Sequence, residues 1–269
     1  MAEYNFLELN IDDRGVAFIT LNRPEIHNAF DDKLIAELTN VFRQIDGDES
    51  VRLAVIAGNG KSFCAGGDLK WMRKMKDYSR EENIDDSAQL EALFATVASF
   101  SKPLIGKVHG AAMGGGSGLT AVCDYVVASD DARFGFTEAR LGIAPSVISP
   151  YVIEKVGISY ARAYFLSGMH FSADIAKDMA LVHRVVSRAE LDEAADETIA
   201  EFLKAAPGAA RKSKALISGI TKLSRDAKAR DAIRTLTIET IADLRVSPEG
   251  QEGMDALLSK RKPNWVKAS

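Results

Sequence analysis

The sequence predicts an α/β protein built on a mostly parallel sheet. Short apolar runs typical of buried strands alternate with segments whose apolar residues recur at helical spacing. Of the 269 residues, 46% are hydrophobic, which is enough to bury a sizeable core. Two glycine-rich loops follow two of the predicted buried strands. Because ligands bind at the carboxyl ends of strands in open α/β sheets, these loops also indicate where a site would lie.

The N-terminal segment predicts a hairpin, a helix and a buried strand, in that order. We expect strands at 6–10 and 16–21, because the Asp12-Asp13-Arg14-Gly15 run between them is typical of hairpin turns. Apolar residues then recur at helical spacing over 31–47, which predicts an amphipathic helix. A buried strand follows at 52–57. This alternation is typical of units that build a parallel sheet.

The first glycine-rich loop, KSFCAGGDL at 61–69, leads into a predicted helix. Asp68 stands just before that helix, so we expect it to act as the N-cap, with a direct ligand contact as the alternative. The segment 77–89 is dense in charge and has no clear periodicity, and we interpret it as a mobile cover over the site. A helix at 90–100 then leads to the next buried strand.

The second glycine-rich stretch, residues 102–124, is the centre of the predicted site. It opens as a buried strand and then places Gly114, Gly115, Gly116 and Gly118 at the start of a short apolar helix. Amides at a helix start lack internal partners and lie at the positive end of the helix dipole, so they can hold an anion or a developing oxyanion. A tight turn without a ligand is the alternative. No Gly-Lys-Ser/Thr follows, which excludes the phosphate loop of nucleotide hydrolases.

Glu138 is the candidate acid or base. It follows a predicted strand at 124–128 and a short extended piece at 132–136, and it stands in a turn-rich, apolar segment. One interpretation is a surface ion pair with Arg140. The other is a desolvated carboxylate whose raised pKa suits a general base. Ser117, between two glycines, is a further candidate for a hydroxyl ligand.

The rest of the chain predicts helices. We expect one more short strand at 181–186. The final third predicts helices that are separated near 207–208 and 247–250, where Pro-Gly and Ser-Pro-Glu-Gly interrupt the pattern.

Composition and charge exclude several classes of protein. The formal net charge is −4 and the pI is near 5.7, so we expect neither a nucleic-acid-binding nor a membrane-surface protein. No apolar run approaches the length of a membrane-spanning helix, and the N-terminus has no signal-peptide core. The four histidines lack metal-ligand spacing. Cys64 and Cys123 are expected to be buried thiols, which fits a reducing, cytoplasmic location.

Five motifs give nearly the whole chain a resemblance to the enoyl-CoA hydratase/isomerase, or crotonase, family. They are LNRPEIHNAF at 21–30, GNGKSFCAGGDL at 58–69, KPLIGKVHGAAMGGGSGL at 102–119, CDYVVASDDARFGFTEARLGIAP at 123–145 and KRKPNW at 260–265. The resemblance implies a crotonase-like spiral of ββα units at 1–190 with a helical C-terminal trimerisation region at 191–269. It also implies a homo-trimer or a hexamer of two trimers, an acyl-CoA thioester as substrate, and no metal or redox cofactor.

The resemblance also assigns roles to individual positions. It places the oxyanion hole on the backbone amides of Gly67 and Gly115 and the catalytic carboxylate on Glu138. The substrate-binding positions that it implies are Arg23, Ile26, Ala65, Asp68, Leu69 and Gly118. Of these, Ala65 and the 23–26 stretch correspond to positions along the adenine and ribose of coenzyme A. The KRKPNW helix resembles a segment that reaches a neighbouring subunit's coenzyme.

Gly118 is a departure from the typical pattern. Typical hydratases of the family carry one glutamate at this position and a second at that of Glu138, whereas the family's double-bond isomerases work with one acid at the Glu138 position. DLKWMRKM and LGIAPSVISPYV, however, resemble a bacterial subgroup of methylglutaconyl-CoA hydratases in which glycine is normal here. We therefore expect hydration of a branched or carboxylated enoyl-CoA, with isomerisation as the alternative. RNA binding, known for a eukaryotic relative, is disfavoured by the acidic charge.

Overall fold

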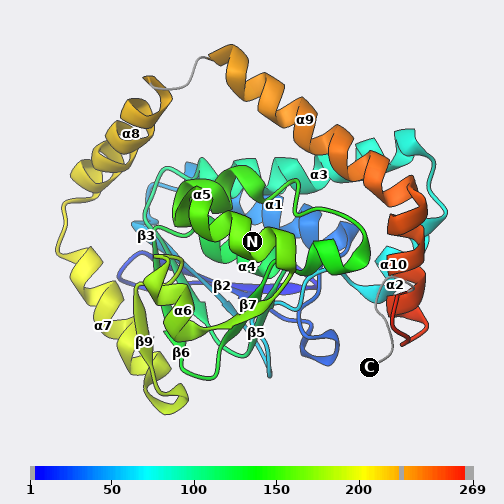
Figure 1. Cartoon of the computed structure of the whole chain (residues 1–269). Coiled ribbons are helices and arrows are strands. Elements are labelled where there is room, and N and C mark those ends of the chain that lie inside the picture. The colour runs from blue at the N-terminus through cyan, green and yellow to red at the C-terminus, as the bar shows by residue number, and fades with distance from the viewer. Residues whose placement is uncertain (1–3, 224–226, 264–269) are drawn as a thin grey trace.

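The predicted buried runs form a six-stranded sheet in the computed structural model, which describes residues 4–223 and 227–263 (Figure 1). The strand order is β1 (Leu7–Ile11), β2 (Val16–Leu21), β3 (Leu53–Gly58), β4 (Leu104–Val108), β6 (Tyr125–Ser129) and β9 (Arg184–Val186). β1 and β2 form the predicted antiparallel hairpin, and the other neighbouring pairs are parallel. The α/β fold class expected from the sequence is confirmed.

A smaller sheet lies next to the central glycine-rich stretch. It consists of β5 (Ala111–Met113), β7 (Arg133–Gly135) and β8 (His170–Ser172). β7 falls within the extended piece expected at 132–136, whereas β5 and β8 were not predicted, because three residues are too few to show a period. Gly114 donates from its amide to the Gly135 carbonyl at 2.9 Å. The small sheet therefore fixes the start of the helix that follows Gly114.

The helices account for most of the remaining chain. They are α1 (Asp32–Gly47), α2 (Leu69–Lys76), α3 (Arg80–Ala98), α4 (Gly115–Val122), α5 (Ser149–Ser167), α6 (Ala173–Asp178), α7 (Leu191–Leu203), α8 (Pro207–Leu223), α9 (Ala227–Val246) and α10 (Pro248–Leu258). Short 3₁₀ helices are η1 (Pro24–Ile26), η2 (Thr137–Leu141) and η3 (Arg188–Glu190). In the part of the chain that the structure describes, no helix is long and apolar enough to cross a bilayer.

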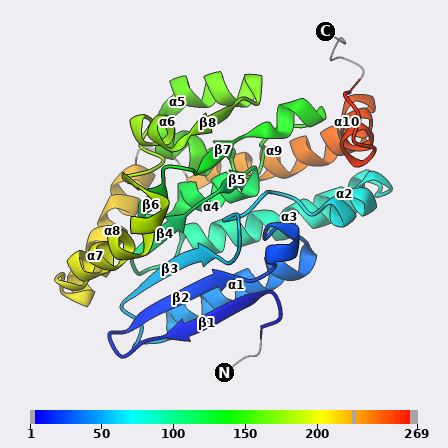
Figure 2. The same ribbon diagram turned by 90° about the horizontal axis from the view of Figure 1, so that it is seen from below.

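The centre of the larger sheet is buried on both faces, and α1 lies against one face behind β1 and β2 in Figure 2. Along β3, Ala54 and Ile56 join the main core, which also contains the apolar residues of α1 and α3. Leu53 and Val55 face the other way and pack with Ile199 of α7. A strand buried on both faces needs a continuous apolar run, which is why this segment shows no polar alternation in the sequence.

One expectation about the segment before residue 90 is wrong. The charged residues 77–89 do not form a separate cover, because α3 begins at Arg80 and runs through them. Ser79 accepts from the Glu82 amide, and Glu82 accepts from the Ser79 amide, which makes a capping box. This reciprocal cap starts the helix about ten residues before the predicted helix at 90–100.

Two of the C-terminal helices, α9 and α10, pack against the preceding part of the chain (Figure 1). α9 lies along α3, and α10 packs against α2 and η2. The expected breaks near 207–208 and 247–250 are present as the starts of α8 and α10. The expected KRKPNW helix is wrong for 260–263, because α10 ends at Leu258 and Lys260 adopts a left-handed φ of 53°. The remainder of that motif lies outside the described residues, and the division at residue 190 stays a prediction.

Candidate active site

A cavity of about 420 Å³ lies where the two glycine-rich loops meet the C-terminal helices. The first loop contributes Ala65, Gly66 and Gly67, and the second contributes Gly114 and Gly115. The apolar walls come from α2, α3, the 141–148 segment, α9 and α10: Trp71, Met72, Met75, Leu90, Leu141, Ile143, Val147, Ile148, Ile241, Met254 and Leu257. The polar side chains on the lining are Thr137, Glu138, Arg140, Ser146, His170 and Arg245.

Two backbone amides of the cavity lining have no acceptor in the described residues. Phe30 donates to the Gly66 carbonyl, and Asp68 donates to the Phe30 carbonyl, each at 2.7 Å. These two bonds use the residues on either side of Gly67, so its own amide takes part in neither. Gly115 is the first residue of α4, and its amide therefore has no partner within the helix. The structure brings these two donors to one cavity, as the two loops predicted. Such a pair can stabilise an oxyanion.

The backbone around these donors requires glycine. Gly66 and Gly114 have left-handed φ values of 95° and 51°, which side chains disfavour. Gly115 is required for space instead, because a Cβ there would lie 2.7 Å from Cε2 of Phe30. Gly67 is less crowded, since its Cβ would first meet Met72 Cγ at 3.4 Å. The donors are therefore held by the conformation and close packing of the loops.

Glu138 presents a desolvated carboxylate to the same cavity. It lies in η2, and its Oε1 is 3.2 Å from the position that a Cβ on Gly114 would take. The residue as a whole is partly exposed, but Oε2 is buried and has no hydrogen-bond partner in the described residues. Burial raises the pKa of Glu138 to about 7, with its own backbone amide opposing the shift. A carboxyl that titrates near neutral pH can both accept and return a proton.

The alternative interpretation of Glu138 as half of a surface ion pair is wrong. In the described part of the chain, Arg140 forms no ion pair with it, and Arg140 Nε instead donates to the Ser167 carbonyl at 3.4 Å. Ser117 is also structural. Its hydroxyl donates to the Ala112 carbonyl at 2.6 Å and is fully buried, so it is not available as a ligand.

Of the six predicted substrate-binding residues, two lie on the cavity lining and four do not. Ala65 and Leu69 line the cavity. Asp68 is the N-cap of α2, as expected, and accepts from the amides of Lys70 at 2.6 Å and Trp71 at 3.1 Å. Arg23 forms ion pairs with Asp31 at 2.8 Å and Asp68 at 3.8 Å and is not part of the lining.

The turn that carries Ile26 lies beside the first glycine-rich loop, although Ile26 is not on the lining. The amide of Ala65 donates to the His27 carbonyl at 3.0 Å, which joins the turn to that loop. Any contact of Ile26 or Arg23 with the adenine and ribose of coenzyme A stays a prediction.

Gly118 lies away from the cavity lining. A Cβ at this position would lie 2.5 Å from Ile148 Cγ2 and 2.9 Å from Phe94 Cε1. The space that a second acid would occupy is therefore filled by two apolar side chains. Among the described residues that line the cavity, Glu138 is the only carboxylate.

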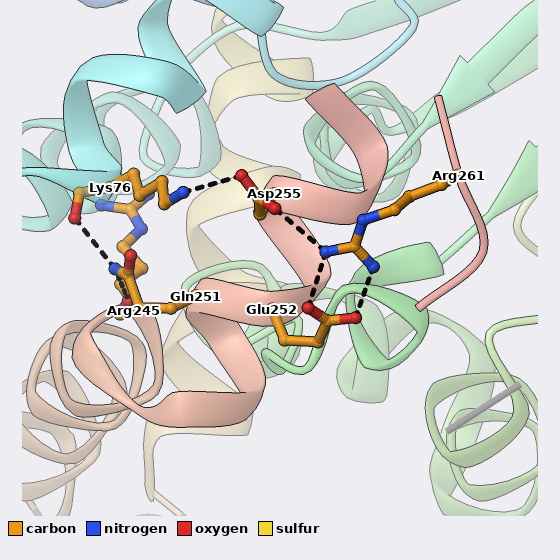
Figure 3. Close-up of polar contacts among 6 residues, drawn as sticks. All are labelled: Lys76, Arg245, Gln251, Glu252, Asp255 and Arg261. Atoms are coloured by element: carbon orange, nitrogen blue, oxygen red, sulfur yellow. Dashed lines mark hydrogen bonds and ion pairs between the residues drawn. The ribbon is translucent and has the colours of Figure 1, made fainter. Parts of the chain in front are cut away.

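Sequence reasoning missed the part of the lining that α9 and α10 supply. These helices are held in place by a polar network (Figure 3). Lys76 of α2 pairs with Asp255 of α10 at 2.8 Å, and Gln251 of α10 donates to the carbonyls of Lys76 and Arg245. Arg261 pairs with both Asp255 and Glu252. The sequence carries no local signal for the contacts of Lys76 with Gln251 and Asp255, because they join segments far apart in the chain.

Other candidate groups form no second site. Cys64 and Cys123 are free, buried thiols, and burial raises the pKa of each to about 12. Among the described residues, no cluster of three or more histidine, cysteine or acidic side chains is placed to hold a metal ion.

The chain resembles known proteins over nearly its whole length. The family described as enoyl-CoA hydratase/isomerase matches residues 12–268. A Thermus thermophilus protein named as an enoyl-CoA hydratase is 30% identical over 257 residues, which cover 96% of this chain and all of that protein. The crystal structure of an enoyl-CoA hydratase from Shewanella pealeana is 36% identical, with a TM-score of 0.79 and coverage of 98% of this chain and 97% of that one. One from Mycobacterium avium is 32% identical, with a TM-score of 0.83 and coverage of 97% and 99%.

Proposed function

The chain belongs to the enoyl-CoA hydratase/isomerase family, and from that premise we propose that it hydrates a branched or carboxylated enoyl-CoA thioester such as 3-methylglutaconyl-CoA. One observation carries the proposal: a single cavity holds two unpartnered amides, of Gly67 and Gly115, together with the buried carboxylate of Glu138. Hydration needs a group of each kind, because it develops negative charge on the thioester oxygen and moves a proton.

The two amides and the carboxylate have different roles in the proposed reaction. The amides of Gly67 and Gly115 donate to the thioester oxygen, which withdraws electrons from the conjugated double bond. Glu138 takes a proton from water as the water oxygen bonds to the β-carbon, and an enolate forms. Glu138 then returns that proton to the α-carbon, which regenerates the carboxylate and adds one water overall. Removal of one such oxyanion donor commonly costs about 3–4 kcal/mol of transition-state stabilisation.

A one-carboxylate mechanism suits this lining, because Ile148 and Phe94 fill the space beside Gly118. The raised pKa of Glu138, about 7, favours a group that accepts and returns a proton in one cycle. The proposed reaction involves no metal or redox cofactor.

Isomerisation of the double bond is the second candidate. With a single carboxylate, Glu138 can remove a proton from the γ-carbon and return it to the α-carbon, while the same amides hold the thioester oxygen. The observation that favours it is again the absence of a second acid from the described lining.

The test that separates these candidates is incubation of the full chain with a panel of enoyl-CoA thioesters. Loss of the conjugated absorbance with a mass gain of one water supports hydration. A moved double bond at unchanged mass supports isomerisation. No change of any thioester, branched, carboxylated or straight, contradicts both.

The proposal includes assembly as a homo-trimer or a hexamer, a cytoplasmic location, and no nucleic-acid or membrane partner. Exposed apolar side chains on α5 support self-association: Ile158, Tyr160 and Leu166. The acidic net charge of −4 argues against nucleic acid. The free thiols Cys64 and Cys123 fit a reducing compartment.

A further inference from the structure

A buried ion pair meets the cavity outside the proposed catalytic set. Arg245 of α9 lines the cavity although only 5% of its surface is exposed. Its Nη1 donates to Asp86 Oδ2 at 2.8 Å and to Ser87 Oγ at 3.1 Å, both on α3. Asp86 Oδ1 accepts from Trp71 Nε1 of α2 at 3.0 Å. Three helices therefore meet at one charged group beside the cavity.

The ion pair leaves part of the guanidinium without a protein acceptor. In the described residues, Arg245 donates from its side chain only through Nη1, so the N–H groups on Nε and Nη2 have no partner there. Both nitrogens keep some exposed surface, so these N–H groups can take an acceptor from outside the protein. Because Arg245 lines the cavity, a ligand in the cavity can supply the acceptor. A carboxylate matches the planar fork of a guanidinium best.

Trp71 links this group to the oxyanion donors. The Arg245 guanidinium carbon lies 5.8 Å from the Trp71 ring centroid. Trp71 Cε3 also lies 3.9 Å from the position that a Cβ on Gly67 would take. Trp71 therefore lies next to both Gly67 and Arg245, so an acyl group that extends from a thioester oxygen at Gly67 towards Arg245 would contact the Trp71 ring.

The charges on the lining favour an anionic acyl group. The described lining carries two guanidinium groups, of Arg140 and Arg245, and one carboxylate, Glu138. Arg140 is exposed and donates to the Ser167 carbonyl, so water screens its charge. Arg245 is buried, where a charge-assisted hydrogen bond is stronger. Asp86 holds the guanidinium in place through Nη1 and leaves its other N–H groups free.

We propose that Arg245 binds a carboxylate at the far end of a short acyl chain and so selects dicarboxylic enoyl thioesters. This inference rests on the proposed function, because it requires a thioester whose oxygen lies at Gly67 and Gly115. Arg245 is a specificity residue in this scheme, and Asp86 is its positioning residue.

The test compares two thioesters of equal chain length, glutaconyl-CoA and trans-2-pentenoyl-CoA, which differ in a terminal carboxylate or methyl group. The wild-type chain should prefer glutaconyl-CoA. The double variant Arg245→Gln/Asp86→Asn removes both charges together, which avoids an unpaired buried carboxylate. It should lower kcat/KM for glutaconyl-CoA roughly tenfold to a hundredfold, mainly through KM. Hydration of trans-2-pentenoyl-CoA should change by less than about threefold.

A second ion pair joins the same two helices, α3 and α9, outside the cavity and serves as a matched control. Arg80 of α3 pairs with Asp243 of α9, and these side chains are 40% and 56% exposed. Arg80→Gln/Asp243→Asn should leave the preference between the two thioesters unchanged. If Arg245→Gln/Asp86→Asn fails to fold, Arg245→Lys is the variant that tests the inference. Lysine keeps the positive charge but lacks the planar guanidinium that can bind a carboxylate through two hydrogen bonds. An unchanged KM for glutaconyl-CoA in that variant overturns the inference.

The two proposals fail in different ways. If the wild-type chain transforms neither thioester, nor any of the wider panel, the proposed function is wrong. If it hydrates trans-2-pentenoyl-CoA as well as glutaconyl-CoA, the role of Arg245 is wrong while the proposed function stands. Equal loss of both activities in the double variant also overturns the role of Arg245, because it indicates a structural effect.

Discussion

Glu138 is the residue on which the proposed proton transfer depends. Glu138→Gln keeps the shape of the side chain and removes the base, so kcat should fall by about 10²–10⁴-fold. Binding of a saturated acyl-CoA should persist, because the amides of Gly67 and Gly115 are unchanged. Steady-state rates and calorimetric titration with butyryl-CoA measure the two effects. Normal hydration by the variant would contradict the role of Glu138.

The raised pKa of Glu138 also predicts how stability depends on pH. Between its ordinary value of 4.5 and about 7, the folded protein keeps a proton that the unfolded chain has released. This contribution to stability is therefore fully present below pH 4.5 and is lost as the pH rises through about 7. Gln cannot titrate, so the stability of Glu138→Gln relative to wild type should rise over this range, by at most about 3 kcal/mol.

Denaturant unfolding of both proteins at pH 5 and pH 8 measures that difference, and subtracting one protein from the other cancels the titration of all other groups. A difference that stays constant between the two pH values would show that the Glu138 carboxylate is well solvated. The rate of hydration gives an independent measurement, since a base role requires activity to rise through about pH 7 in the wild type.

Packing around Gly118 decides whether a glutamate can be accommodated at this position. Gly118→Glu would add the second acid of typical hydratases, but its Cβ would lie 2.5 Å from Ile148 Cγ2. We expect the variant to lose about 3 kcal/mol of stability through crowding and a buried charge, without a gain in hydration of straight-chain thioesters. Thermal unfolding and rate measurements check both effects. Gly118→Glu/Ile148→Ala should recover part of the stability, whereas a stable single variant with higher activity would contradict the packing argument.

At the scale of elements, α1 depends on a buried cation at its C-terminal end. Lys102 is fully buried and donates from Nζ to the carbonyls of Ile45 at 2.6 Å and Asp48 at 2.5 Å. Lys102→Met keeps the length of the side chain and leaves both carbonyls unpaired, which should cost about 3 kcal/mol of unfolding free energy. Urea unfolding measures the loss. Lys204→Met, which removes an exposed ion pair with Glu201, should change stability by less than about 1 kcal/mol and serves as the control.

The elements that the sequence predicts well are those with local signals. The β1–β2 hairpin depends on the Asp12–Gly15 turn, and α1 depends on the Asp31 cap and the spacing of its apolar residues. The two glycine-rich loops were predictable for the same reason, because each follows a buried strand, but the resemblance was needed to assign the donors to Gly67 and Gly115. Glu138 needed the resemblance as well, since its sequence context alone left an ion pair open.

The features that were missed depend on contacts between distant segments. Nothing near Gly118 in the sequence indicates that Phe94 and Ile148 occupy the adjacent space. Likewise, Arg245 is an ordinary helical arginine until α9 packs along α3 and brings it to Asp86. Side-chain environments of this kind are set by tertiary packing, which propensity and periodicity do not encode.

At the scale of the whole molecule, the exposed apolar residues of α5 give the proposed self-association a direct test. Leu166 is 82% exposed and Ile158 is 66% exposed, and burial of such side chains against another copy would be favourable. Leu166→Glu/Ile158→Glu should shift the chain from trimer or hexamer towards monomer, as measured by light scattering after size-exclusion chromatography. The desolvation of two carboxylates opposes association, and neither residue lines the cavity.

The control for this prediction adds a carboxylate on another face. Asn40 is exposed on α1, so Asn40→Glu should leave the assembly unchanged. Unchanged mass of Leu166→Glu/Ile158→Glu in solution would remove α5 from any interface. If the variant becomes monomeric and keeps full hydration, the cavity of one chain is sufficient for the reaction, which is what we expect because its own α9 and α10 line the cavity. Loss of activity on dissociation would instead show that a neighbouring copy completes the coenzyme site.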